Sequence, residues 1–106
     1  SHMLNQMSKL LNPDLIQSIN LSSNRLSERF IKGFLMNISN YSSLTFLDLS
    51  FNEIGGEYMT CLTELLKNSS SLVTLLLNNN VLGASGARFI GDGLSQNKIL
   101  KKLEII

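Results

Sequence analysis

The fold of this chain is decided by residues 44–54, which read Leu-Thr-Phe-Leu-Asp-Leu-Ser-Phe-Asn-Glu-Ile. Before the asparagine, aliphatic residues recur at every second position, which is the spacing of a strand with one buried face. Leu47 and Leu49 are therefore expected to point into a core. Phe46 and Asp48 are expected to point away from it.

The same pattern recurs along the chain at a constant spacing. The first residues of successive blocks are 28 positions apart, and each block repeats the aliphatic frame. Asparagine stands at the same place in each complete block. A fixed period of this length indicates a solenoid of stacked units. The blocks begin at Ile16, Leu44, Leu72 and Leu100.

Helical spacing follows each asparagine, for example at Phe30, Phe34 and Ile38, which lie four apart. Stacked strands would form a parallel sheet, and the returning helices would cover its inner face. We therefore predict an α/β solenoid with a short parallel sheet on its concave face and helices on its convex face.

Two details of the predicted helices come from single residues. Ser27 and Ser85 are predicted to be N-caps, because a hydroxyl can accept a hydrogen bond from a free N–H group of the first turn. Gly91 and Gly93 lie inside the third helix, where each is expected to cost about 1 kcal/mol relative to alanine.

One domain is predicted for residues 4–106, and Ser1–Met3 are interpreted as the remnant of a cleaved affinity tag. The chain is interpreted as a fragment of a larger protein, with a natural terminus as the alternative. The predicted units are a partial repeat at 4–15 (with a helix at 4–12), repeats at 16–43, 44–71 and 72–99, and a truncated repeat at 100–106.

The blocks resemble leucine-rich repeats, and their length and helical second half are similar to the ribonuclease-inhibitor-like subclass. The resemblance covers residues 16–106. That subclass is found in intracellular proteins such as NOD-like receptors, Ran GTPase-activating protein and tropomodulin-like actin-capping proteins. The resemblance implies the fold and a cytoplasmic location, but this fold hosts many activities. A secreted bacterial effector is the alternative.

Asn24, Asn52 and Asn80 are predicted to be structural residues. Each amide is expected to turn inward and bond the backbone of the bend after its strand, so that adjacent repeats share a ladder of hydrogen bonds. Contacts to a ligand are the alternative interpretation.

The outward strand positions are the candidate binding surface, because an array places equivalent residues side by side. Phe46, Phe51 and Leu76 are apolar where solvent favours polar side chains. Scattered apolar surface residues are the alternative. The candidates for protein binding are Ser18, Asn20, Phe46, Asp48, Phe51, Thr74, Leu76 and Asn78.

The residues that catalysis requires are largely missing from the sequence. Cys61 is the only cysteine and His2, within the interpreted tag remnant, is the only histidine. A Cys–His or Ser–His–Asp nucleophile and a Cys/His zinc site therefore lack their residues. We expect no enzymatic activity, no metal and no cofactor.

Charge and hydropathy argue against nucleic acids and membranes as partners. The formal net charge is +1, and the basic cluster of Lys98, Lys101 and Lys102 lacks interleaved aromatic residues. No apolar run approaches the about 20 residues that span a bilayer.

A non-enzymatic protein–protein interaction module is the leading hypothesis. The alternatives are a scaffold element of a cytoskeletal or ciliary complex and, from the resemblance, GTPase activation through Arg25 or Arg29. An exposed terminal strand also predicts weak self-association by edge pairing.

Overall fold

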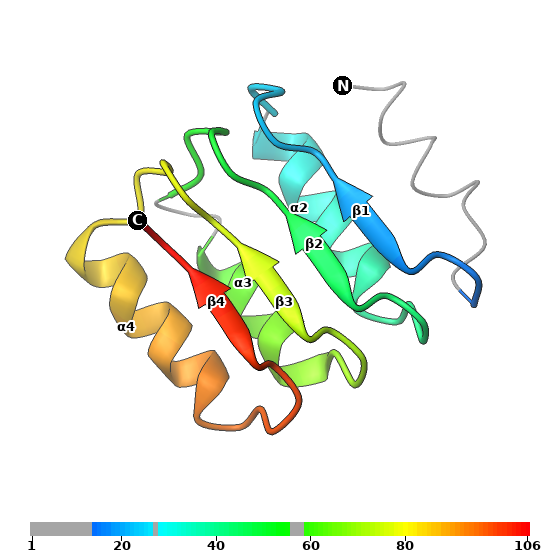
Figure 1. Cartoon of the computed structure of the whole chain (residues 1–106). Helices are drawn as coiled ribbons and strands as arrows, with labels where there is room; N and C mark the ends of the chain where they lie inside the picture. Colours follow the sequence, from blue (N-terminus) through cyan, green and yellow to red (C-terminus); the bar gives the residue numbers. More distant parts are fainter. Residues whose placement is uncertain (1–13, 27, 56–58) are drawn as a thin grey trace.

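The computed structural model describes residues 14–26, 28–55 and 59–106 of the chain. In this part of the chain four short strands alternate with three helices (Figure 1). The interpreted tag remnant and the helix predicted at 4–12 lie outside the described residues. The elements are β1 Ser18–Asn20, α2 Glu28–Ile38, β2 Phe46–Asp48, α3 Met59–Asn68, β3 Thr74–Leu76, α4 Gly83–Leu94 and β4 Lys102–Glu104.

The strands form one parallel sheet in the order β1-β2-β3-β4. The Cα partners are Ser18 with Phe46, Phe46 with Thr74, and Thr74 with Lys102, so each pairing joins equivalent positions of successive repeats. Figure 1 shows the three helices together on one side of the sheet. The predicted leucine-rich repeat solenoid is therefore confirmed as the fold.

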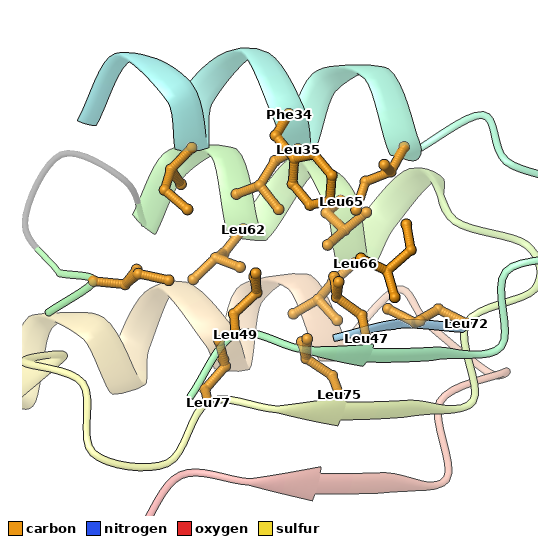
Figure 2. Close-up of a cluster of buried hydrophobic side chains, with 14 of the residues drawn as sticks. Phe34, Leu35, Leu47, Leu49, Leu62, Leu65, Leu66, Leu72, Leu75 and Leu77 are labelled. Atoms are coloured by element: carbon orange, nitrogen blue, oxygen red, sulfur yellow. The ribbon is translucent and has the colours of Figure 1, made fainter. Parts of the chain in front are cut away.

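The core lies between the sheet and the helices, and one side of it is formed by inward residues of the strands and of the segments next to them (Figure 2). Leu47, Leu49 and Leu75 are 0% exposed. Full burial of a leucine side chain contributes about 1.5–3 kcal/mol relative to leaving it in water. Leu103 on the edge strand β4 is half-buried and packs against the same core.

The helices form the other side of the core, and their buried residues include sets spaced four apart. Phe30, Phe34 and Ile38 are buried, and the rings of Phe30 and Phe34 stack at a centroid distance of 5.3 Å. Leu62 and Leu66 take the same places in α3. Among the described helices, none has the length and hydropathy needed to cross a bilayer.

Gly93 has a packing role in α4 that the sequence did not indicate. A Cβ atom at this position would lie 2.8 Å from Leu66 Cβ and 3.2 Å from the carbonyl oxygen of Thr63. The missing side chain thus lets α4 approach α3 closely. A Cβ at Gly91 would meet nothing within 4 Å, so the expected cost of a helical glycine applies there without this compensation.

The predicted N-cap at Ser85 is wrong. Helix α4 begins at Gly83, its N-cap is Leu82, and no side chain caps its first turn. The helix starts earlier because the Gly86 N–H donates to the Leu82 carbonyl oxygen at 3.0 Å, which places Ser85 inside the first turn. Ser27 lies outside the described residues.

Candidate functional site

We call the outward side chains of β1–β4 the concave strand face. Six of the eight predicted binding residues belong to it, and Phe51 and Asn78 lie in the turns after β2 and β3. Neighbouring strands lie about 4.8 Å apart, so side chains of one row are adjacent. One row across the sheet is Ser18, Phe46, Thr74 and Lys102, and the next is Asn20, Asp48, Leu76 and Glu104.

Apolar side chains occupy the middle of the concave strand face. Phe46 and Leu76 are half-buried, and Leu76 lies in its row between Asp48 and Glu104. Phe51, just beyond the end of β2, is 54% exposed. The register therefore brings together predicted candidates that are 28 positions apart in the chain.

Phe51 also has an unusual backbone conformation. Its φ is 60°, in the left-handed region, and its N–H donates to the Asn78 carbonyl oxygen at 2.8 Å. Ser23 and Asn79 hold the same place in their turns, with φ of 60° and 56°. Asparagine adopts this region readily, whereas a bulky side chain is strained there. An exposed aromatic residue held under strain is a functional candidate.

The polar candidates on β1 and β2 are partly used inside the protein. Asn20 Oδ1 accepts hydrogen bonds from the Ser22 N–H at 3.0 Å and from its hydroxyl at 2.8 Å. Asp48 Oδ1 accepts one from the Ser50 N–H at 2.9 Å. These Asx turns close the bend after each strand. These turns were not predicted, although Asn or Asp two residues before Ser is a usable signal in the sequence.

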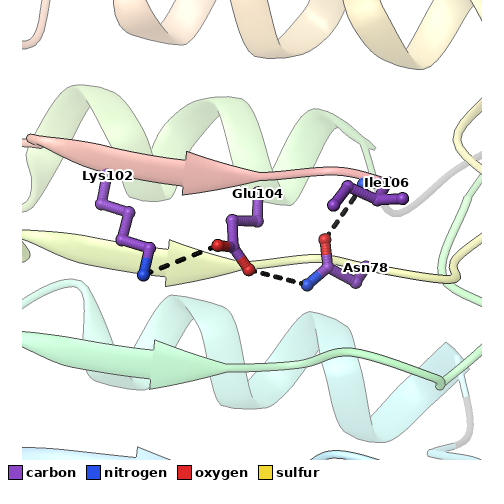
Figure 3. A network of polar contacts seen from close by, with 4 residues as sticks. All are labelled: Asn78, Lys102, Glu104 and Ile106. Carbon is purple, nitrogen blue, oxygen red and sulfur yellow. Dashed lines mark hydrogen bonds and ion pairs between the residues drawn. The ribbon is translucent and has the colours of Figure 1, made fainter.

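Asn78 joins β3 to the last strand (Figure 3). Its Nδ2 donates to Glu104 Oε1 at 2.9 Å, and its Oδ1 accepts from the Ile106 N–H at 3.0 Å. Its own N–H donates to Ser50 Oγ at 3.1 Å. Asn78 thus has direct internal partners on both sides, which leaves it less free to contact another protein.

Glu104 is held as a carboxylate by its neighbours. The hydrogen bond from Asn78 and the charge of Lys102 lower the pKa of Glu104. Lys102 Nζ lies 3.5 Å from Glu104 Oε2 (Figure 3). One lysine of the basic cluster at 98–102 is thereby paired with an acid on the concave strand face.

Asn80 links two repeats through its side-chain amide. Its Nδ2 donates to the carbonyl oxygens of Leu49 at 3.0 Å and Leu77 at 3.1 Å. Its Oδ1 accepts from the backbone N–H groups of Asn52 at 3.0 Å and Ile54 at 2.9 Å. One side chain therefore satisfies four backbone groups of two neighbouring turns.

Asn52 makes the equivalent contacts one repeat earlier and is 2% exposed. Its Nδ2 donates to the carbonyl oxygens of Leu21 at 2.9 Å and Leu49 at 3.0 Å, and its Oδ1 accepts from the Asn24 N–H at 2.9 Å. Asn24 bonds the backbone of its own turn as predicted, through Nδ2 to the Ser22 carbonyl oxygen at 2.9 Å, but it is exposed and not turned inward. In the ladder, the asparagine side chains hydrogen-bond to the backbone of the preceding repeat. Asn24 belongs to the first repeat that the structure describes.

A shallow groove of about 280 Å³ lies on the convex side between α2 and α3. Its lining includes the buried Leu35 and Leu65, the half-buried Cys61, and Met36, which is 70% exposed. Among the described residues, no three His, Cys, Asp or Glu side chains gather where they could hold a metal ion.

A family model described as Leucine Rich Repeat matches residues 43–65. No curated protein matches the chain. Among solved structures, the chain is similar to one titled Leiomodin-1 Actin-Binding Site 2, with a TM-score of 0.83 and 18% identity over 95% of this chain and 58% of that one. It is also similar to a tropomodulin C-terminal domain of Caenorhabditis elegans, with a TM-score of 0.64 and 16% identity over 99% of this chain and 81% of that one.

At identities this low, the structural similarity shows a shared fold and nothing more. The chain spans 58% of the leiomodin-1 chain. The ribonuclease-inhibitor-like subclass stays a prediction. The repeated aliphatic frame, the stacked parallel sheet and the family match at residues 43–65 together show that the chain has the leucine-rich repeat fold.

Proposed function

We propose that this chain is a non-enzymatic protein–protein interaction module that receives its partner on the concave strand face. One observation carries the proposal. The strand register places the half-buried Phe46 and Leu76 in the middle of this face, with Phe51, 54% exposed, at its end. Aromatic and aliphatic side chains ringed by polar residues are typical of the centre of a binding surface.

The double substitution Phe46→Ala with Leu76→Ala tests the proposal. Both side chains point away from the core, so the unfolding transition is expected to stay cooperative. We expect a protein captured from a source-cell extract by the unmodified chain to be lost with the double variant. Met36→Ala is the matched control, because Met36 is 70% exposed on the convex side. Equal capture by the folded double variant would show that the concave strand face is not the binding surface.

A second candidate function is binding to the actin cytoskeleton. It is supported by the fold shared with the structure titled Leiomodin-1 Actin-Binding Site 2, at a TM-score of 0.83. Co-sedimentation with actin filaments and the polymerisation of labelled actin test it, with the concave double variant alongside. Loss of actin binding in the double variant would show that actin is bound on the concave strand face. The absence of any actin binding by the unmodified chain would remove the second candidate. No observation on the described residues favours GTPase activation through Arg25 or Arg29.

An intracellular location belongs to the same proposal. Cys61, the single cysteine in the sequence, is a free thiol, whereas small secreted domains are commonly stapled by disulfides. Fluorescence microscopy of the tagged protein in its source cells tests the location.

A further inference from the structure

We propose that the concave strand face binds a basic side chain, arginine in preference to lysine, carried by an otherwise apolar segment of the partner protein. This inference rests on the proposed function and adds the chemistry of the partner. The subsite consists of Asp48, Leu76 and Phe46.

Asp48 supplies the charge that selects a basic group. Among the described residues no lysine or arginine forms an ion pair with it, whereas Glu104 is paired with Lys102 at 3.5 Å. The Asp48 side chain is half-buried and accepts one internal hydrogen bond, from Ser50. A carboxylate has about four acceptor positions, so Asp48 retains acceptor capacity for a partner.

Glu104 strengthens the preference for a cation. Asp48 and Glu104 flank Leu76 in the same row, and the charge of Asp48 opposes ionisation of Glu104. This row thus carries two carboxylates, and the ammonium group of Lys102 in the neighbouring row offsets only one of them. An acidic partner group would meet a net negative charge at this place, which disfavours it.

The neighbouring apolar side chains select the rest of the basic residue. Leu76 is the register partner of Asp48, and Phe46 lies two positions before Asp48 on the same face of β2. The aliphatic stem of an arginine can lie along Leu76 while its head reaches Asp48. A guanidinium group also stacks on an aromatic face and pairs with a carboxylate through two parallel bonds. The ammonium group of lysine is neither planar nor able to form two parallel hydrogen bonds with one carboxylate. Arginine is therefore preferred.

Asp48→Asn isolates the charge without disturbing the turn. Asn20 forms the same Asx turn with Ser22 at 3.0 Å, so asparagine can keep the bond that Asp48 makes with Ser50. The control is Asp92→Asn, an exposed acid on the convex helix α4.

The probe is a displayed library of random peptides selected on the immobilised chain. We expect the selected peptides to carry arginine beside apolar residues. Asp48→Asn should weaken a selected peptide about tenfold, the loss of roughly one charge-assisted hydrogen bond. Asp92→Asn should leave its affinity unchanged. Added salt should weaken binding to the unmodified chain more than binding to Asp48→Asn.

Four outcomes would contradict this inference, and they separate it from the proposed function. Selected peptides that need Phe46 and Leu76 but tolerate Asp48→Asn would overturn the inference and leave the proposed function standing. Enrichment of acidic peptides that need the same two residues would do the same. Selected peptides that tolerate the Phe46→Ala, Leu76→Ala double variant, or a failure to select any peptide, would count against both.

Discussion

At the scale of single residues, Phe51 combines a left-handed backbone, with φ of 60°, and a side chain that is 54% exposed. Phe51→Asn is expected to stabilise the fold by about 0.5–1 kcal/mol, because asparagine tolerates this conformation and holds the equivalent place at Asn79. Urea unfolding measures the change. The reverse swap, Asn79→Phe, should have the opposite sign, and a less stable Phe51→Asn variant would contradict the argument.

The asparagine ladder gives a second residue-scale prediction. Asn52→Ala should cost about 1–3 kcal/mol, because it leaves the part-buried carbonyl group of Leu21 without its donor and the part-buried N–H group of Asn24 without its acceptor. Asn24→Ala should cost less than about 1 kcal/mol, because Asn24 is exposed and its amide bonds only Ser22 among the described residues. Chemical denaturation of the two variants under the same conditions measures the loss in the free energy of unfolding for each. Equal losses would show that the ladder is not what stabilises the turns.

At the scale of elements, the packing of α4 on α3 depends on one glycine. Gly93→Ala is expected to destabilise by about 1–3 kcal/mol, since the new Cβ would lie 2.8 Å from Leu66 Cβ. Gly91→Ala should instead stabilise by about 0.5–1 kcal/mol, because its Cβ meets nothing within 4 Å and alanine favours the helix. Thermal unfolding of both variants tests whether the two substitutions change the stability in opposite directions. A stabilising Gly93→Ala would refute the close approach of the helices.

The attachment of β4 should depend on pH through Glu104. Folding lowers the pKa of this carboxyl from its ordinary value of 4.5, so the native state favours the ionised form. Its contribution to stability is therefore complete above 4.5 and is lost as the pH falls through the lower native value. Glu104→Gln should be less stable than the unmodified chain at neutral pH, and the difference should vanish in acid, once the pH is below the native pKa of Glu104. A difference that persists in acid would contradict this.

At the scale of the whole molecule, β4 is one of the two edge strands of the described sheet, and pairing between chains along it is expected. Lys102 on this strand and Lys101 just before it are exposed, and exposed lysines on an edge strand oppose pairing between chains. We therefore predict self-association that is weak and rises with protein concentration. Light scattering over a concentration series measures it, and a strictly monomeric species at the highest concentration would refute it.

The overall architecture was largely predictable because its determinants are local and repeated. The period-two pattern around Leu47 defines a buried strand face, and the constant spacing of the blocks defines which strand residues pair. The rows of the concave strand face follow from that register alone. Whether they bind a partner stays a prediction.

The amino-acid sequence by itself determined the number of stacked strands, their register and the aliphatic core, since these follow from side-chain alternation within each repeat. The tertiary structure decided the details that depend on contacts between repeats. It placed Ser85 inside a helix, gave Gly93 a packing role and left Asn24 exposed. It also engaged Asn20 and Asn78 in internal hydrogen bonds. The physical reason is that close approaches and hydrogen-bond partners arise only once neighbouring repeats are stacked in space.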